Sequence, residues 1–158
     1  MINCKYSYSF WLENLQQAQS LLSMPICINS EYYLVMLLEQ SIHGDFLANN
    51  NQLIQFVNHE VSNYKELADQ CLLISGMFPE RSIALGAGSV VPIWWVGECS
   101  YKKVAGCNEV YKLLALNFQD YVDLLLCMRY LITNDPGSIK LLQNLASTGS
   151  RYPNFIAN

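Results

Sequence analysis

The segment from residue 108 to residue 133 constrains the fold of this 158-residue chain more than any other feature. At about 100° per residue, its polar side chains fall on a stripe roughly 100° wide, and nearly all other positions are apolar. The stripe consists of Glu109, Lys112, Gln119, Asp120 and Asp123. A helix that is apolar on most sides must be covered by other helices. The pattern therefore predicts one long helix over about 108–133 at the centre of a bundle.

Apolar residues at three- and four-residue steps predict further helices, separated by helix-breaking residues. These helices span about 7–23, 31–47, 52–78, 92–105 and 138–146, and the third bends near 59–63. Asn29 or Ser30 is expected to cap the second, and Gly106 to follow the fourth. No stretch alternates apolar and polar residues long enough to predict a strand. We therefore expect an all-α, single-domain bundle of five to six helices over residues 1–158.

The amino-acid composition indicates a large hydrophobic core, and the charge balance restricts the kinds of partner that the chain can bind. Hydrophobic residues make up 52% of the chain and charged residues 14%, against about 25% charged in ordinary globular domains. A disordered chain would show the reverse balance. The net charge is −4, and Lys102-Lys103 is the only adjacent basic pair. Because nucleic-acid binding needs a basic patch, we expect no nucleic-acid partner.

Cysteine spacing and hydropathy bear on the location of the protein. None of the six cysteines has the C-x-x-C spacing of a zinc ribbon or redox pair. Cys71 and Cys127 adjoin leucine runs, where we expect them to be small buried apolar residues. The longest uncharged apolar stretch, 82–97, has 16 residues, fewer than the ~20 of a membrane span. Polar residues interrupt the first fifteen positions, so we expect no signal peptide, no membrane partner and a cytoplasmic protein with reduced thiols.

The run Cys71-Leu-Leu-Ile-Ser-Gly-Met-Phe-Pro-Glu80 resembles the signature of an uncharacterised family of small helical bacterial proteins. In that family a helix ends in a Leu-x-x-Ser-Gly-x-Phe-Pro-Glu-like run, and an aromatic pair, a glycine and a tyrosine follow. Here Trp94-Trp95, Gly97 and Tyr101 occupy those places, although the family's pair is usually Tyr-Tyr. The resemblance covers roughly residues 61–149. It implies an all-α fold and a bacterial origin, and it carries over no activity and no catalytic residue.

The richest cluster of candidate binding residues opens the helix predicted at 92–105. Trp94, Glu98 and Tyr101 share one face, Trp95 lies on the adjacent face, and Glu80 precedes them. Two tryptophans beside a carboxylate could line a pocket for an aromatic or cationic small molecule. In the alternative interpretation both tryptophans are core residues and Glu98 pairs with a nearby base. Aromatic stripes at helical spacing usually pack, which favours the alternative.

Arg129 is the second candidate, because its helical angle places it opposite the polar stripe. A buried charge needs a partner, and Glu80 or Glu98 could supply one. Arg129 would then bind an anion at the foot of the pocket. In the favoured alternative its stem covers apolar surface while its head reaches water near the helix end.

Metal and catalytic signatures are weak. Glu39 and His43 share a helix face, and His59-Glu60 could add ligands, but a di-iron bundle needs Glu-x-x-His on each of two helices. Gly86-Ala-Gly88 lacks the third glycine of a dinucleotide fingerprint, and no Gly-x-Ser-x-Gly elbow occurs. We therefore expect no metal, no cofactor and no catalytic residue.

These patterns favour a non-enzymatic module that acts through protein contact, with a homodimer as one form. The acidic charge, the missing catalytic set and the high apolar content motivate this interpretation. An exposed apolar patch would mark the interface. The alternative is a small-molecule-binding protein or an enzyme with a pocket near Trp94, Glu98, Tyr101 and Arg129.

Overall fold

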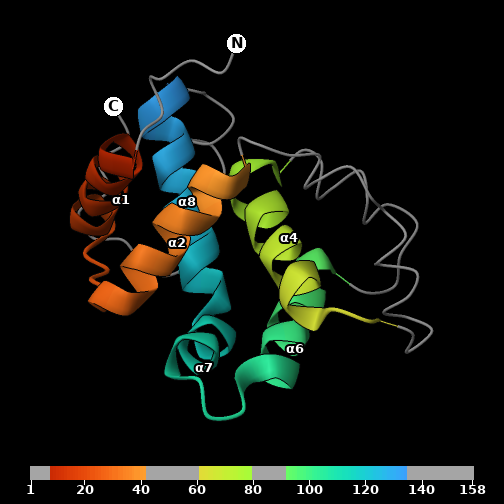
Figure 1. Cartoon of the computed structure of the whole chain (residues 1–158). Coiled ribbons are helices and arrows are strands. Elements are labelled where there is room, and N and C mark those ends of the chain that lie inside the picture. Colours follow the sequence, from red (N-terminus) through yellow and green to blue (C-terminus); the bar gives the residue numbers. More distant parts are fainter. Residues whose placement is uncertain (1–7, 42–60, 80–91, 135–158) are drawn as a thin grey trace.

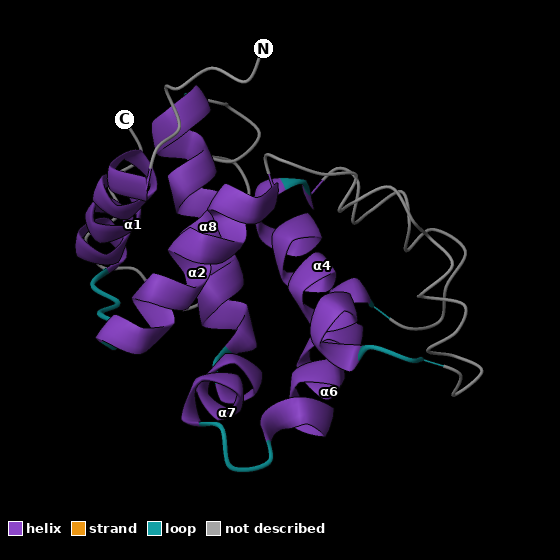
Figure 2. Cartoon of the chain, viewed as in Figure 1, coloured by secondary structure: helices purple, strands orange, loops and turns teal. Residues whose placement is uncertain are grey.

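A computed structural model describes residues 8–41, 61–79 and 92–134, which form six helices (Figure 1). The helices are α1 (Tyr8–Leu22), α2 (Ile28–Ser41), α4 (Tyr64–Met77), α6 (Ile93–Ala105), α7 (Glu109–Leu116) and α8 (Phe118–Thr133). No strand occurs in these three ranges (Figure 2), so the expected all-α bundle is confirmed. None of these helices is long and apolar enough to cross a membrane.

Helix α8 runs through the middle of the bundle (Figure 1). It packs against α1 and α4 and also contacts α6 and α7, while α2 lies against α1 and α7. Every residue from Tyr121 to Met128 is buried. The expectation that this part of the chain is central is therefore confirmed.

The single helix expected over 108–133 is wrong in one respect, because the chain bends at Asn117. Its backbone angles (φ −114°, ψ 29°) end α7 and start α8. The Asn117 N–H donates to the Leu113 carbonyl, and Phe118 beyond it is almost fully buried. Asparagine is a weak helix former, and the bend lets α7 pack on α6 while α8 enters the core. The expected polar stripe also ends early, because Asp123 is only 2% exposed.

Side-chain caps set several helix boundaries. Asn63 starts α4, because its side chain accepts a hydrogen bond from the Glu66 N–H. Asn108 starts α7 in the same way. Helix α2 begins at Ile28, so Asn29 and Ser30 lie in its first turn and the expected cap there is wrong. Gly106 follows α6 as expected, with a positive φ of 45° that only glycine adopts readily.

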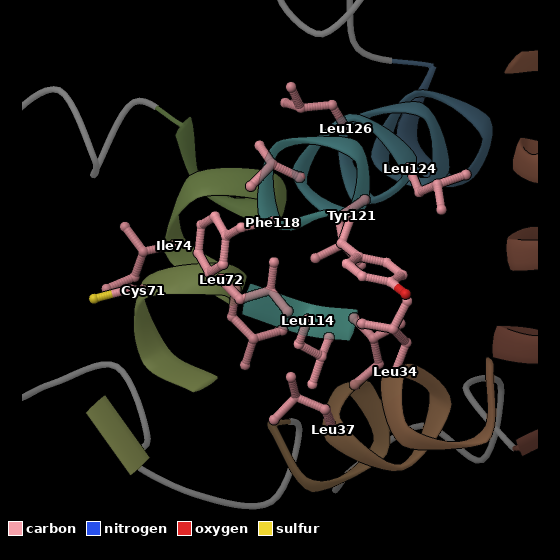
Figure 3. Packing of buried hydrophobic residues seen from close by; sticks show 14 of the residues in the cluster. Leu34, Leu37, Cys71, Leu72, Ile74, Leu114, Phe118, Tyr121, Leu124 and Leu126 are labelled. Carbon is pink, nitrogen blue, oxygen red and sulfur yellow. The ribbon is translucent and has the colours of Figure 1, made fainter. Parts of the chain in front are cut away.

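One apolar cluster with side chains from all six helices forms the core (Figure 3). Cys71 and Cys127 are buried in it, as predicted. Two glycines bring helices close together: Gly76 of α4 meets Leu125 of α8, and Gly97 of α6 meets Phe118 and Cys71. The predicted helix 138–146, the 81–91 connection and both histidines lie outside the described residues.

Candidate functional site

The predicted tryptophans lie at the start of α6 and are not core residues. Trp94 is 39% exposed and Trp95 is 43% exposed. The interpretation that both pack inside the bundle is therefore wrong. Glu80 lies outside the described residues.

Glu98 and Arg129 have separate local partners. Glu98 forms an ion pair with Lys102 one turn later, at 3.1 Å, as the alternative interpretation predicted. The Arg129 Nη1 donates to the carbonyl oxygen of Met77 at 3.1 Å. Met77 is the last residue of α4, where the helix dipole is negative and favours a cation. The structure thus directs Glu98 and Arg129 to separate partners instead of gathering them in one pocket.

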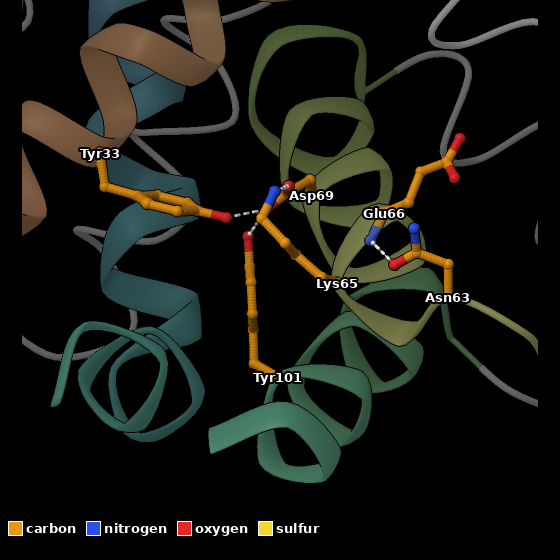
Figure 4. A network of polar contacts seen from close by, with 6 residues as sticks. All are labelled: Tyr33, Asn63, Lys65, Glu66, Asp69 and Tyr101. Atoms are coloured by element: carbon orange, nitrogen blue, oxygen red, sulfur yellow. Dashed lines mark hydrogen bonds and ion pairs between the residues drawn. The ribbon is translucent and has the colours of Figure 1, made fainter. Parts of the chain in front are cut away.

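Tyr101, the remaining predicted residue, belongs to a buried polar network centred on Asp69 (Figure 4). Asp69 Oδ1 accepts hydrogen bonds from the Tyr101 hydroxyl at 2.6 Å and from the Tyr33 hydroxyl at 2.5 Å. Asp69 Oδ2 accepts from Lys65 Nζ at 2.8 Å. Tyr33 lies on α2, Lys65 and Asp69 on α4, and Tyr101 on α6. One carboxylate therefore joins three helices.

The network provides hydrogen-bond partners for the carboxylate of Asp69, which is almost completely buried. The Asp69 side chain is 3% exposed, whereas the Lys65 side chain is 47% exposed. A buried carboxylate is costly unless it is paired and hydrogen-bonded. Lys65 meets this need because residues four apart share a helix face, and the two hydroxyl groups complete the coordination of the carboxylate.

The same contacts fix the protonation of the other groups. Burial raises the pKa of Tyr33 and Tyr101 well above the ordinary value, and the nearby charge of Asp69 raises it further. Burial lowers the pKa of Lys65, but the hydrogen bond and charge of Asp69 outweigh this, so the pKa is raised overall. At neutral pH the tyrosines are therefore neutral donors and Lys65 is a cation.

Aromatic contacts hold the two hydroxyl groups in place. The ring of Tyr111 stacks on Tyr101, with centroids 6.2 Å apart and an interplanar angle of 18°. It meets Tyr33 edge-on at 5.8 Å and 87°. The ammonium of Lys65 lies 5.7 Å from the Tyr33 ring centroid, within the range of a cation–π contact.

This arrangement suits a structural role better than acid–base chemistry. Both Asp69 oxygens accept hydrogen bonds, and the side chain is nearly inaccessible. A substrate would have to compete with Tyr33, Lys65 and Tyr101 for the carboxylate. Within the described residues, no three His, Cys, Asp or Glu side chains come together as a metal site.

A groove of about 260 Å³ lies beside the network, between α2 and α4. We call it the α2–α4 groove; it is lined by Tyr32, Tyr33, Met36, Leu37, Gln40, Lys65 and Asp69. Ile28, Tyr32, Met36 and Gln40 follow one another at four-residue steps and form a ridge along α2, which we call the α2 ridge. Ile28 is 78% exposed and Tyr32 is 56% exposed. Apolar surface therefore continues from the groove along the outside of α2.

The sequence pattern did not predict that Tyr33, Lys65 and Asp69 form a group. One signal was present, because Asp69 interrupts an apolar helix four residues after Lys65. The tyrosines that complete the network lie 36 and 32 residues away along the chain. Their approach depends on the tertiary packing that brings α2 and α6 near α4, which the local pattern does not contain.

A second pocket, of about 220 Å³, contains the exposed thiol of Cys27. Cys27 directly precedes α2, and its Sγ lies 3.2 Å from the Ser30 Oγ. This side-chain hydrogen bond lowers the pKa of the Cys27 thiol. Ser30 is held in turn by the hydroxyl of Tyr121 at 3.2 Å. The local spacing of six scattered cysteines gave no indication that Cys27 would differ from the others.

Comparisons of the chain with protein families, with curated proteins and with solved structures gave no match. The resemblance to the family of small helical bacterial proteins therefore stays a prediction.

Proposed function

We propose that this protein is a protein-interaction module that binds its partner with the α2 ridge and the α2–α4 groove. The observation that carries this proposal is the exposure of Ile28 and Tyr32, at 78% and 56%, on the ridge that borders the groove. Exposed apolar surface next to a hollow is typical of a contact surface. We place the module in the bacterial cytoplasm as a non-enzymatic accessory protein.

The size of the groove favours a protein partner over a small molecule. Its volume of about 260 Å³ is below the roughly 300–1,000 Å³ of small-molecule sites. Pockets at protein interfaces receive single anchor side chains from the partner. A small ligand would also leave Ile28 uncovered, whereas a protein segment would bury it.

The Asp69 network gives the groove a fixed shape. Tyr33 and Asp69 both line the groove and bind each other across α2 and α4. A surface that is ordered before binding costs less conformational entropy when the partner arrives. The network thus supports binding without contributing chemistry of its own.

The alternative, a small-molecule pocket or active site near Trp94, Glu98, Tyr101 and Arg129, has less support. Tyr101 is fully buried against Asp69. Glu98 and Arg129 have the separate partners described above.

Site-specific photo-crosslinking tests the proposal. A benzophenone amino acid at Tyr32 should capture a partner in cells that produce the protein naturally, and the same group at the exposed Lys103 of α6 should not. The captured protein is identified by mass spectrometry, purified and titrated against the native chain and Tyr32→Glu. We expect at least about tenfold weaker binding by Tyr32→Glu, as for a moderate interface hot spot. Equal affinity for the two chains, or capture by Lys103 alone, would contradict the proposal.

A further inference from the structure

We infer that the partner inserts an apolar anchor side chain into the α2–α4 groove and that a carboxylate beside this anchor binds Lys65. The inference rests on the proposed function and specifies the chemistry of the partner. It commits to a segment of a separate protein, and a second copy of this chain is a distinct outcome of the test.

The accessible charge of the groove is positive. Lys65 and Asp69 form one ion pair, but the side chain of Lys65 is 47% exposed and that of Asp69 only 3%. An incoming group therefore meets the ammonium and not the carboxylate. Lys65 would repel a cationic group of the partner. A neutral group would form no ion pair with the Lys65 ammonium.

The ammonium of Lys65 has hydrogen-bond donors that the described contacts do not use. An ammonium carries three N–H groups, and one of them donates to Asp69 Oδ2. Its remaining described contact is with the face of the Tyr33 ring, which uses no hydrogen-bond donor. Figure 4 shows the side chain of Glu66 pointing away from this network. Lys65 can therefore donate to a further acceptor, and a carboxylate gives the strongest hydrogen bond.

The position of Lys65 is fixed before the partner binds. Asp69 holds the ammonium at 2.8 Å, and the Tyr33 ring lies 5.7 Å from it. A carboxylate that binds here does not have to order a free lysine side chain, which otherwise reduces the benefit of surface ion pairs.

The apolar part of the groove provides the site for the anchor side chain of the partner. Met36, Leu37 and the ring of Tyr32 line it together with Lys65. Methionine adapts its shape to different side chains, and a tyrosine ring offers a broad apolar face. The groove therefore fits an aromatic or aliphatic side chain that lies close to a carboxylate.

Two matched probes test this chemistry: N-acetyl-phenylalanine, which has a carboxylate, and N-acetyl-phenylalaninamide, which has none. Each is titrated into the full chain while amide and methionine methyl NMR signals are followed. We expect both probes to shift signals of Tyr32, Met36 and Lys65, and the carboxylate probe to bind about two- to fivefold more tightly, as for a partly exposed ion pair.

Two variants of Lys65 test whether this residue causes the preference for the carboxylate probe over the amide probe. Lys65→Met should abolish it, and Lys65→Arg should keep it. Lys112→Met is the matched control, because Lys112 is 49% exposed and is also paired with an acidic residue of its own helix, Glu109. The control should keep the full preference for the carboxylate probe.

The outcomes separate the two proposals. Equal binding of the probes by the native chain, or a preference that survives in Lys65→Met, would overturn the role of Lys65 and leave the proposed function standing. If neither probe shifts the groove signals, the inference of an inserted anchor fails, while the crosslinking experiment decides the proposed function separately. If sedimentation shows a dimer that Tyr32→Glu dissociates, a second copy occupies the groove and the inference of a separate partner is wrong.

Discussion

The carboxylate of Asp69 is 3% exposed, and a charge so far from water needs partners that replace its hydration. It obtains them from side chains of α2, α4 and α6. The pair is not simply a buried salt bridge, because Lys65 remains half in water. At the scale of single residues, the network therefore combines a buried acceptor with an exposed cation.

Replacing Asp69 with asparagine should destabilise the fold. The Asp69→Asn substitution keeps the shape but removes the charge that Lys65 and the two hydroxyl groups bind. We expect the free energy of unfolding to fall by about 2–3 kcal/mol, the scale of hydrogen bonds to a charged group. Urea unfolding measures it, with Glu109→Gln as a control, because that exposed pair contributes less than about 1 kcal/mol. Equal effects of the two substitutions would contradict the structural role of Asp69.

Stability should also fall at alkaline pH. Burial raises the pKa of the Cys71 and Cys127 thiols from 9.0 to about 12, and the pKa of Tyr33 and Tyr101 is raised above 10.0. The unfolded chain therefore loses these protons at lower pH than the folded chain, so this stability is complete below pH 9 and declines above it. Unfolding free energies measured from pH 7 to pH 11 should decrease beyond pH 9. In Tyr33→Phe the decrease above pH 10 should be shallower, and a flat profile in the native chain would contradict the prediction.

The thiols should differ in reactivity. Ser30 lowers the pKa of Cys27, and the thiolate is the reactive form. Iodoacetamide at pH 8 should therefore modify Cys27 first, and Cys71 and Cys127 only on unfolding, as followed by peptide mass spectrometry. Ser30→Ala should slow the modification of Cys27. Faster labelling of the buried thiols than of Cys27 would show that this ranking is wrong.

At the scale of elements, the local pattern predicted the helices better than their boundaries. The apolar surroundings of 121–128 predicted that α8 is central, because burial on all sides requires apolar residues on all sides. The bend at Asn117 was not predictable from this pattern, because apolar residues recur at helical spacing on both sides of it. It follows from the packing of α7 on α6, which is a tertiary contact.

The close approach of α6 to its neighbours gives a prediction at this scale. A Cβ at Gly97 would clash with the Phe118 ring and lie 2.8 Å from the Cβ of Cys71. Alanine improves helix propensity by about 1 kcal/mol over glycine, but overpacking costs about 1–3 kcal/mol. We expect Gly97→Ala to lower the free energy of unfolding by up to about 2 kcal/mol in urea titrations, because the overpacking cost exceeds the gain in helix propensity. Lys103→Ala on the exposed side of α6 is the control, and a Gly97→Ala protein more stable than the native chain would contradict this packing.

At the scale of the whole molecule, the described helices bury most of α8 and leave Ile28 and Tyr32 of α2 exposed. The sequence predicted an exposed apolar patch in general but placed the candidate site on α6, because Trp94 and Trp95 are its most conspicuous aromatic pair. The groove arises instead where α2 meets α4, between residues far apart in the chain. Of the predicted site residues that the structure describes, Tyr101 takes part in the Asp69 network.

A comparison of dissociation constants tests whether the α2 ridge is the contact surface. Ile28 and Leu116 are both 78% exposed, but only Ile28 lies on the α2 ridge. We expect Ile28→Glu to weaken binding of the captured partner by at least about tenfold, and Leu116→Glu to bind it as the native chain does. Equal dissociation constants for Ile28→Glu and the native chain would contradict this role of the ridge.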